Sequence, residues 1–259
     1  MRRTLERSGS LWVPSRREML GALGIGLLAP RMASAATFAL VDHSKTKIPY
    51  GTTVTNTIDS SGADLLICVI CTDQSSGANI QSDSKGNTWI LLRDQTCWWT
   101  GLIRLYYCIP TSVGSGHFLE IEGSRVGSVF FSGFSGALQS TPADQQNGNG
   151  TVNPNTAVTL ATGSIAPAYP NELVVTACIS PDGDSTGLNS GVLLDHLDNA
   201  SAASGGGFGY LIQTTSTPVN LTWTQSVNSQ MATAIASFKS TSSSSVSSTA
   251  VRHRVIGGN

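Results

Sequence analysis

Two carboxylates lie two residues apart in the segment 119–122, which alternates like a β-strand. Residues i and i+2 of a strand point to one face of a sheet, so Glu120 and Glu122 are expected side by side. Retaining glycosidases use such a pair as acid and nucleophile, with carboxyl groups ~5 Å apart. A Gly-Ser-Arg sequence follows here, in place of the third acidic residue typical of those sites. Glu120 and Glu122 are therefore either a catalytic pair or part of a solvated polar face.

Two adjacent aromatic residues, Trp98 and Trp99, follow Cys97 in a turn-like segment. Exposed aromatic rings on a sandwich can stack on the apolar face of a sugar, which makes this pair the candidate ligand-binding site. The alternative is that both rings fold over the end of a sheet and close the core, since Trp buries a large apolar area.

Four carboxylates, Asp182, Asp184, Asp195 and Asp198, occupy two neighbouring loops. Calcium prefers such oxygen-rich loops, but the spacing of known calcium loops is missing, so ordinary turn chemistry is the favoured explanation of these residues. The run Gly205–Gly207 has no following helix or lysine and does not match a phosphate-binding loop. We therefore expect no metal and no cofactor.

Nucleophilic catalysis has little support in the sequence. No Gly-x-Ser-x-Gly motif occurs, and His117, His196 and His253 have no evident Ser or Cys partner nearby. A Ser-His-Asp triad assembled from distant residues stays open as an alternative.

Short apolar runs separated by Gly, Asn, Asp, Pro and Ser predict β-strands throughout the chain, in two similar series. Residues 64–67 match 172–175, residues 102–107 match 208–212, and residues 117–121 match 219–223. Each series ends in an apolar strand that carries Phe, and the polar stretch 139–155 joins them. This pattern predicts two pseudo-repeats of about 100 residues each. The alternative is that amphipathic strands simply look alike.

Five or six strands with one apolar face are too few to stand alone, so the two series should pack on one another. The predicted fold is an all-β, two-sheet sandwich with a shared core, and a jelly roll is the expected topology.

The chain has five cysteines, at positions 68, 71, 97, 108 and 178. Cys68 and Cys71 are three apart on a predicted strand and should point to opposite faces, which argues against a shared metal. Because most of the five lie in apolar strand patterns, we expect buried thiols rather than disulfides.

The segment 82–89, Ser-Asp-Ser-Lys-Gly-Asn-Thr-Trp, reads as a hairpin turn, with Asp83 bonding backbone amides and Gly86 or Asn87 at positive φ. Together with the Asp-Leu-Leu strand at 64–66 and the Asn-Glu-Leu strand at 171–173, it resembles a loosely defined family of secreted bacterial β-sandwich modules. The resemblance covers roughly residues 54–239. It implies a structural role for each of these motifs and a catalytic role for none.

The N-terminal segment resembles a twin-arginine signal peptide. Arg16 and Arg17 precede a short apolar run at 20–29, and an Ala-Ser-Ala exit follows at 33–35. The run is too short for a stable bilayer span, which needs roughly 20 residues. We expect a signal peptide over 1–35, one sandwich domain over 36–239, and a Ser/Thr-rich linker with a short tail over 240–259.

The net charge is −1, and it becomes −5 without residues 1–35, which hold six basic and two acidic side chains. This charge argues against nucleic acid as a partner. The sequence favours an exported bacterial module, periplasmic or at the cell surface, that acts without catalysis in surface, matrix or ligand binding. A glycan or cell-surface polymer is the expected partner. The alternatives are a carbohydrate-active sandwich (a binding module or a concanavalin-like glycoside hydrolase) and a subunit of an extracellular assembly.

Overall fold

The computed structural model describes residues 37–73, 77–97, 101–123, 126–152, 156–198 and 204–242, without the side chains of residues 185 and 186. The chain divides into two units, Met1–Ser34 and Ala35–Asn259, and every described residue belongs to the second. The described ranges form sixteen β-strands and contain no helix long and apolar enough to cross a membrane. The expected all-β class is confirmed.

The strands fall into two series of eight. The first series is β1 (Ala39–Ile48), β2 (Thr53–Val54), β3 (Leu65–Asp73), β4 (Ala78–Asp83), β5 (Ile90–Cys97), β6 (Gly101–Cys108), β7 (Leu119–Gly123) and β8 (Gly127–Ser135). The second series is β9 (Ala143–Gly150), β10 (Ala157–Ala161), β11 (Glu172–Ser180), β12 (Ser185–Leu188), β13 (Val192–Leu197), β14 (Gly205–Gln213), β15 (Thr222–Ser229) and β16 (Ala232–Phe238).

The two series have the same topology. The first forms a five-stranded sheet, β1-β8-β3-β6-β5, and a three-stranded sheet, β2-β7-β4. The second forms β9-β16-β11-β14-β13 and β10-β15-β12. Adding eight to each label of the first half gives the second. The segments matched in the sequence fall on corresponding strands (β3 and β11, β6 and β14, β7 and β15), which supports the predicted pseudo-repeat.

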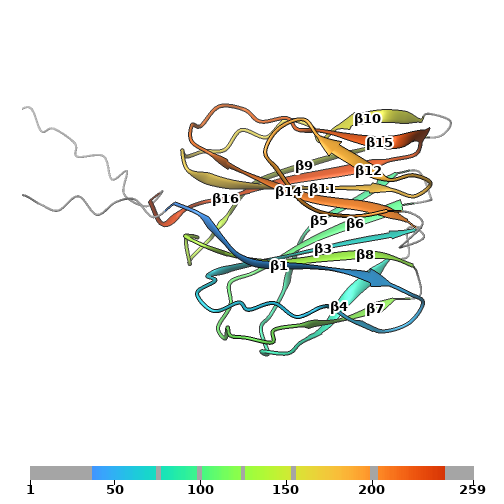
Figure 1. Cartoon of the computed structure of the whole chain (residues 1–259). Helices are drawn as coiled ribbons and strands as arrows, with labels where there is room; N and C mark the ends of the chain where they lie inside the picture. Colours follow the sequence, from blue (N-terminus) through green and yellow to red (C-terminus); the bar gives the residue numbers. More distant parts are fainter. Residues whose placement is uncertain are drawn as a thin grey trace, which may run out of the picture. The chain divides into compact units, whose positions relative to one another are not determined.

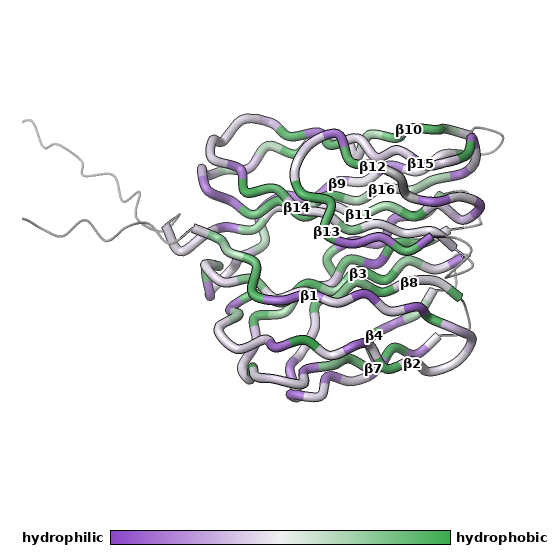
Figure 2. The backbone as a smooth tube through the Cα atoms, in the orientation of Figure 1, coloured by the Kyte–Doolittle hydropathy of each residue, from purple (hydrophilic) through white to green (hydrophobic). Residues whose placement is uncertain are grey.

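The sheets lie in four layers, with the five-stranded inner sheets between the three-stranded outer sheets (Figure 1). Along β3, the side chains of Leu65 and Ile67 enter the core between the inner sheets, while those of Leu66 and Ile70 enter the core under β2-β7-β4. β11 is buried on both faces in the same way. Its Leu173 side chain enters the core between the inner sheets, and its Val174 side chain enters the core under the outer sheet β10-β15-β12. Strands buried on both faces read as continuous apolar runs, and Figure 2 shows such runs in the central strands.

This architecture differs from the expected pair of sheets. Each half is a sandwich in its own right, because short strands cover the outer face of its inner sheet: β2, β4 and β7 in the first half, and β10, β12 and β15 in the second. β2 has only two residues and carries no strand signal in the sequence. Jelly-roll topology for the whole domain is not confirmed.

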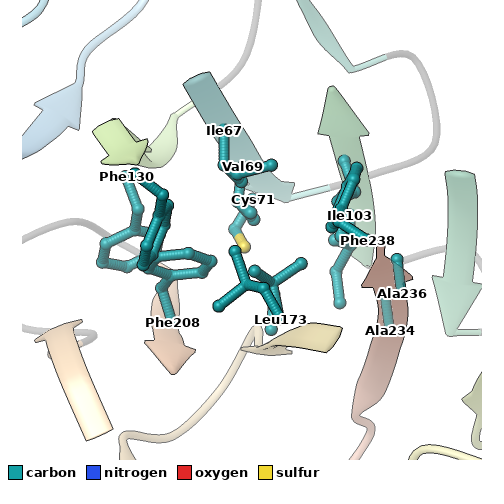
Figure 3. Close-up of a cluster of buried hydrophobic side chains, with 14 of the residues drawn as sticks. Ile67, Val69, Cys71, Ile103, Phe130, Leu173, Phe208, Ala234, Ala236 and Phe238 are labelled. Carbon is teal, nitrogen blue, oxygen red and sulfur yellow. The ribbon is translucent and has the colours of Figure 1, made fainter. Parts of the chain in front are cut away.

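The contact between the halves is nearly symmetric under their exchange. The ring of Tyr107 meets that of Phe238 edge-on at 5.6 Å, and the ring of Tyr210 meets that of Phe134 edge-on at 5.4 Å. The two tyrosines hold corresponding positions on β6 and β14, and the two phenylalanines on β8 and β16. Phe130 of one inner sheet stacks with Phe208 of the other in the same core, beside Ile67 and Leu173 (Figure 3).

All five cysteines are buried thiols, as expected. Cys68 lies in the core under the outer sheet and Cys71 in the core between the inner sheets, so they point to opposite faces of β3. Burial raises the pKa of both thiols and raises the pKa of Cys108 to about 12. Protonated, water-excluded thiols are poor nucleophiles and act here as small apolar side chains.

Candidate functional site

Glu120 and Glu122 lie on the outer face of the sheet β2-β7-β4. Their neighbours on β7, Leu119 and Ile121, are buried in the core beneath, while Glu120 is half-buried and Glu122 is exposed. The Glu120 carboxylate accepts a hydrogen bond of 2.7 Å from the Ser82 hydroxyl, across the strand pair. Glu120 and Glu122 therefore lie on one face of the sheet, as predicted, and this face is in contact with solvent.

An open cavity of about 640 Å³ adjoins Glu122 at the end of this sheet. Its most prominent feature is the Tyr50 ring, which is 68% exposed and follows β1. We call it the Tyr50 cavity; it is lined by Tyr50, Gly51, Thr52, Gly77, Asn79, Glu122 and Gly123.

Close approach of the chain segments shapes the wall of the Tyr50 cavity. The Gly51 amide donates to the Gly123 carbonyl at 3.0 Å, which ties the segment after β1 to the end of β7. A Cβ added to Gly123 would lie 2.5 Å from the Cβ of Ala78, so only glycine allows β7 this close to β4. Gly77, at φ +39, occupies a backbone region that other residues rarely adopt.

The amide of Asn79 is held in one orientation. Its Oδ1 accepts hydrogen bonds from Arg104 Nη1 at 2.5 Å and from the Tyr106 hydroxyl at 3.1 Å. Arg104 is in turn paired with Asp94 at 3.1 Å. Because the guanidinium only donates, the amide oxygen must face it, and the Asn79 NH2 group is left to donate elsewhere. The cavity thus combines an exposed ring, an oriented amide and a carboxylate.

A Ser-His-Asp chain exists in the core at the other end of the sheet β2-β7-β4, away from the Tyr50 cavity. His117 Nδ1 lies 2.8 Å from Ser60 Oγ, and His117 Nε2 lies 2.9 Å from Asp83 Oδ1. Sequence reasoning does not find Ser60 as a partner of His117, because the two residues are far apart in the chain. All three side chains are at most 1% exposed, so no substrate reaches the hydroxyl. This arrangement supports a structural role and not the triad alternative.

Asp83 joins this network to the turn that follows β4. Its carboxylate accepts from the Lys85 amide at 2.7 Å and from Trp89 Nε1 at 2.9 Å, and Gly86 has φ +76. The predicted amide bonding and positive φ are confirmed. The prediction of a hairpin is wrong, because β4 and β5 belong to different sheets. The turn is a crossover between layers, which pairwise strand patterns cannot distinguish from a hairpin.

The aspartates of the second half do not share a common partner. Asp195 Oδ2 lies 2.6 Å from His43 Nδ1 across the two halves, Asp182 accepts from the Ser229 hydroxyl, and the Asp184 amide donates to Ser226 Oγ. Asp198 follows the end of β13. Among the residues that the structure describes, no three His, Cys, Asp or Glu side chains form a group suited to a metal ion.

Trp98 and Trp99 lie outside the described residues. His196 is on β13, with its carbonyl accepting from Lys45 Nζ at 3.0 Å, and His253 is also outside the described residues. Comparisons with protein-family models, curated proteins and solved structures find no match for this chain. The Tyr50 cavity is therefore the feature of the described residues from which a function can be inferred.

Proposed function

We propose that this chain is an exported, non-catalytic module that binds a carbohydrate chain at the Tyr50 cavity. The observation that carries the proposal is the convergence of the exposed Tyr50 ring, the oriented Asn79 amide and the Glu122 carboxylate at one open hollow. The chain's low content of charged residues, 12%, and its acidic balance fit a neutral ligand better than a polyanion.

The chemistry of a pyranose matches these three groups. One face of the ring presents C–H groups that can pack on an aromatic ring, and its hydroxyls both donate and accept hydrogen bonds. Tyr50 supplies the flat apolar surface with a polar tip, which suits a wet site. The Glu122 carboxylate accepts from hydroxyls and the Asn79 NH2 group donates to them. A few oriented polar groups beside an apolar surface are the usual design of a ligand site.

Binding without hydrolysis is the better-supported activity. A glycosidase needs one carboxyl group to protonate the leaving oxygen and a second to attack or to activate water, both flanking the same bond. Glu122 is exposed on an open face, and Glu120 is already engaged by Ser82. Nothing in the described part of the site encloses the pair and excludes water from it, as efficient acid–base catalysis requires.

A glycan array followed by calorimetry on residues 36–259 tests the proposal. We expect Tyr50→Ala to weaken binding of the best oligosaccharide at least tenfold, about 1.4 kcal/mol, with an unchanged circular dichroism spectrum. Val158→Ala is the matched control, because Val158 is an exposed apolar side chain on the opposite outer sheet. Unchanged affinity of the Tyr50 variant would refute this site. If Trp98→Ala with Trp99→Ala abolished binding instead, the ligand platform would be there.

Hydrolysis is tested on the same material. We expect no release of reducing sugar by the wild-type chain. Glu122→Gln should weaken binding, and Glu120→Gln, whose partner is Ser82, should have the smaller effect. Sugar release that both substitutions abolish would favour the glycosidase alternative.

The export part of the proposal depends on Arg16 and Arg17. Replacing both with Lys should retain the protein in the cytoplasm, because twin-arginine recognition requires the paired guanidinium groups. Cell fractionation measures this, and unchanged export of the Lys-Lys variant would contradict it.

A further inference from the structure

A second cavity, of about 400 Å³, lies beside β5 at the edge where the two halves meet. Ile90, Tyr107 and Ile109 form one side, and Pro142 and Ala143 form the other. Thr88, Gln139, Ser140 and Thr141 add polar groups around it. We call this cavity the β5 groove. It is separate from the Tyr50 cavity, with which it shares no lining residue.

The other half of the molecule has a corresponding place. Tyr107 pairs with Ile67 and Ile90, and Tyr210 pairs with Val175 and Val192, so Tyr210 and Val192 correspond to Tyr107 and Ile90. Ile90 and Val192 are similarly exposed, at 49% and 47%.

The β5 groove and the corresponding place beside β13 differ in the side chains of the strand that the opposite half contributes: β9 at the groove and β1 at the corresponding place. Leu40 of β1 pairs with Phe134, and Ala143 of β9 pairs with Phe238, which makes Leu40 and Ala143 corresponding residues. Two positions earlier in each half stand Phe38 and Thr141. At these two positions, the large apolar side chains of Phe38 and Leu40 thus correspond to the small side chains of Thr141 and Ala143.

Burial differs accordingly. Phe38 is 3% exposed and belongs to the core between the inner sheets, together with Phe134, with Leu40 and Tyr210 packed against that core. Thr141, the corresponding residue, is exposed. The β5 groove therefore lies where the symmetric arrangement would have an aromatic ring and a leucine, and it is continuous with the inter-half core through Tyr107, Ile109 and Ala143.

We propose that the β5 groove is a binding site for a small aromatic molecule. Such a ring would take the place that Phe38 has in the other half, with its face against the apolar wall of Tyr107 and Ile109 and its edge towards the hydroxyls of Ser140 and Thr141. The volume lies within the range of small-molecule sites, and apolar walls with a few polar groups at the mouth are typical of them. The groove is independent of carbohydrate binding.

The test uses indole as the probe and residues 36–259 as the protein. We expect saturable binding by calorimetry and saturation-transfer NMR. Thr141→Phe combined with Ala143→Leu copies the other half into the groove and should weaken indole binding at least tenfold while raising the melting temperature. Should this variant fail to fold, Ile90→Arg, at a half-exposed edge position, places a charge on the wall and should weaken binding equally.

Controls separate this site from the others. Val158→Phe adds a ring on a distant outer strand and should leave indole binding unchanged, as should Tyr50→Ala. No saturable binding by the wild type, or full binding by the filled variant, would refute the proposal. Binding that appears only after residues 243–259 are removed would mean that the chain's own tail occupies the groove, and would also overturn it.

Discussion

At the scale of single residues, the Asp83 carboxylate joins three parts of the first half: the crossover turn, Trp89 just before β5, and His117 just before β7. Burial by itself would raise the pKa of Asp83. The hydrogen bonds from His117, Trp89 and the Lys85 amide outweigh it, so the pKa lies below its usual value. A buried carboxylate with this many donors is stable only while all of them are present.

Asp83→Ala should therefore be strongly destabilising. Removing one partner of a buried charged network leaves His117 and Trp89 without their acceptor and costs about 3–5 kcal/mol. Because the pKa of Asp83 is lowered in the folded state, its contribution is full above the unfolded pKa of about 3.9 and is lost as the pH falls through the lower folded value. Urea unfolding at pH 7 and pH 3 measures both effects. Asp59→Ala, at a fully exposed neighbour, is the control and should change little.

The pKa of Glu172, at the start of β11, is shifted in the opposite direction to that of Asp83. The Glu172 side chain is fully buried, and Oε1 accepts from the Tyr169 amide at 3.1 Å. Burial raises the pKa of Glu172 most and the nearby Asp144 carboxylate raises it further, and together they outweigh the hydrogen bonds from Ser237 and the Tyr169 amide, which lower it. Lys239, 3.7 Å from Asp144, neutralises part of this acidic pair. Ionisation of Glu172 in the folded state is thus unfavourable.

Glu172→Gln should raise the melting temperature at pH 8. A raised folded pKa means that the native state is stabilised below the unfolded pKa and loses that stability as the pH rises through the folded value. The advantage of the glutamine variant should therefore shrink towards pH 4. Asp64→Asn is the matched control, since Asp64 holds the corresponding position and accepts from the Gly136 and Ala137 amides. It should lower stability, and a pH-independent gain in the Glu172 variant would contradict the argument.

At the scale of elements, the two halves repeat even their irregularities. β5 has a bulge between Leu91 and Arg93, and β13 has one between Leu193 and Asp195. Leu92 and Leu194, skipped by these bulges, both pack against the inter-half core. Each bulge thus bends an edge strand so that an additional leucine faces inward, which explains why both copies keep it.

β9 and β5 lie so close together at Gly150 that adding a single methyl group there should lower the stability of the fold strongly. A Cβ added there would lie 1.9 Å from the carbonyl oxygen of Thr96, so β9 would have to move away from β5. Gly150→Ala should cost about 2 kcal/mol or more, as overpacking against backbone does. Gly187→Ala on β12 meets nothing closer than 3.9 Å and should cost under about 1 kcal/mol. Denaturant unfolding compares them, and equal effects would contradict the tight contact.

The sequence predicts the central strands of the two inner sheets well. It does not predict the three-stranded outer sheets that cover them. Continuous apolar runs such as 65–72 identify buried strands, and their similarity to 172–179 predicts the repeat. The outer sheets depend on short segments such as β2, whose two residues have no periodicity to detect. Glu120 and Glu122 were placed correctly on one face because alternation is local. Ser60 and Tyr50 were missed, because their roles depend on chain segments that meet only in the folded structure.

At the scale of the whole described unit, two sandwiches of one topology meet through equivalent surfaces, as subunits of a twofold dimer do. Tyr107 with Phe238 and Tyr210 with Phe134 are the two copies of one contact. The linking segment between β8 and β9 adds hydrogen bonds at the junction, including that of the Leu138 amide to the Lys239 carbonyl. Each half covers its own outer face, so the inter-half core is the only large apolar surface that separation of the described halves would expose.

The two halves should therefore assemble when produced as separate chains. Co-expression of residues 36–139 and 140–259 should give a one-to-one complex with the circular dichroism spectrum of the intact domain, because strand pairing within each inner sheet is complete without the covalent link. Phe208→Asp should abolish the complex, since it places a carboxylate opposite Phe130 in the dry core, at a cost of several kcal/mol. Val158→Asp, on an exposed outer position, should leave it intact. Size-exclusion chromatography with light scattering distinguishes the outcomes, and fragments that fold separately without associating would show that the inter-half core is dispensable.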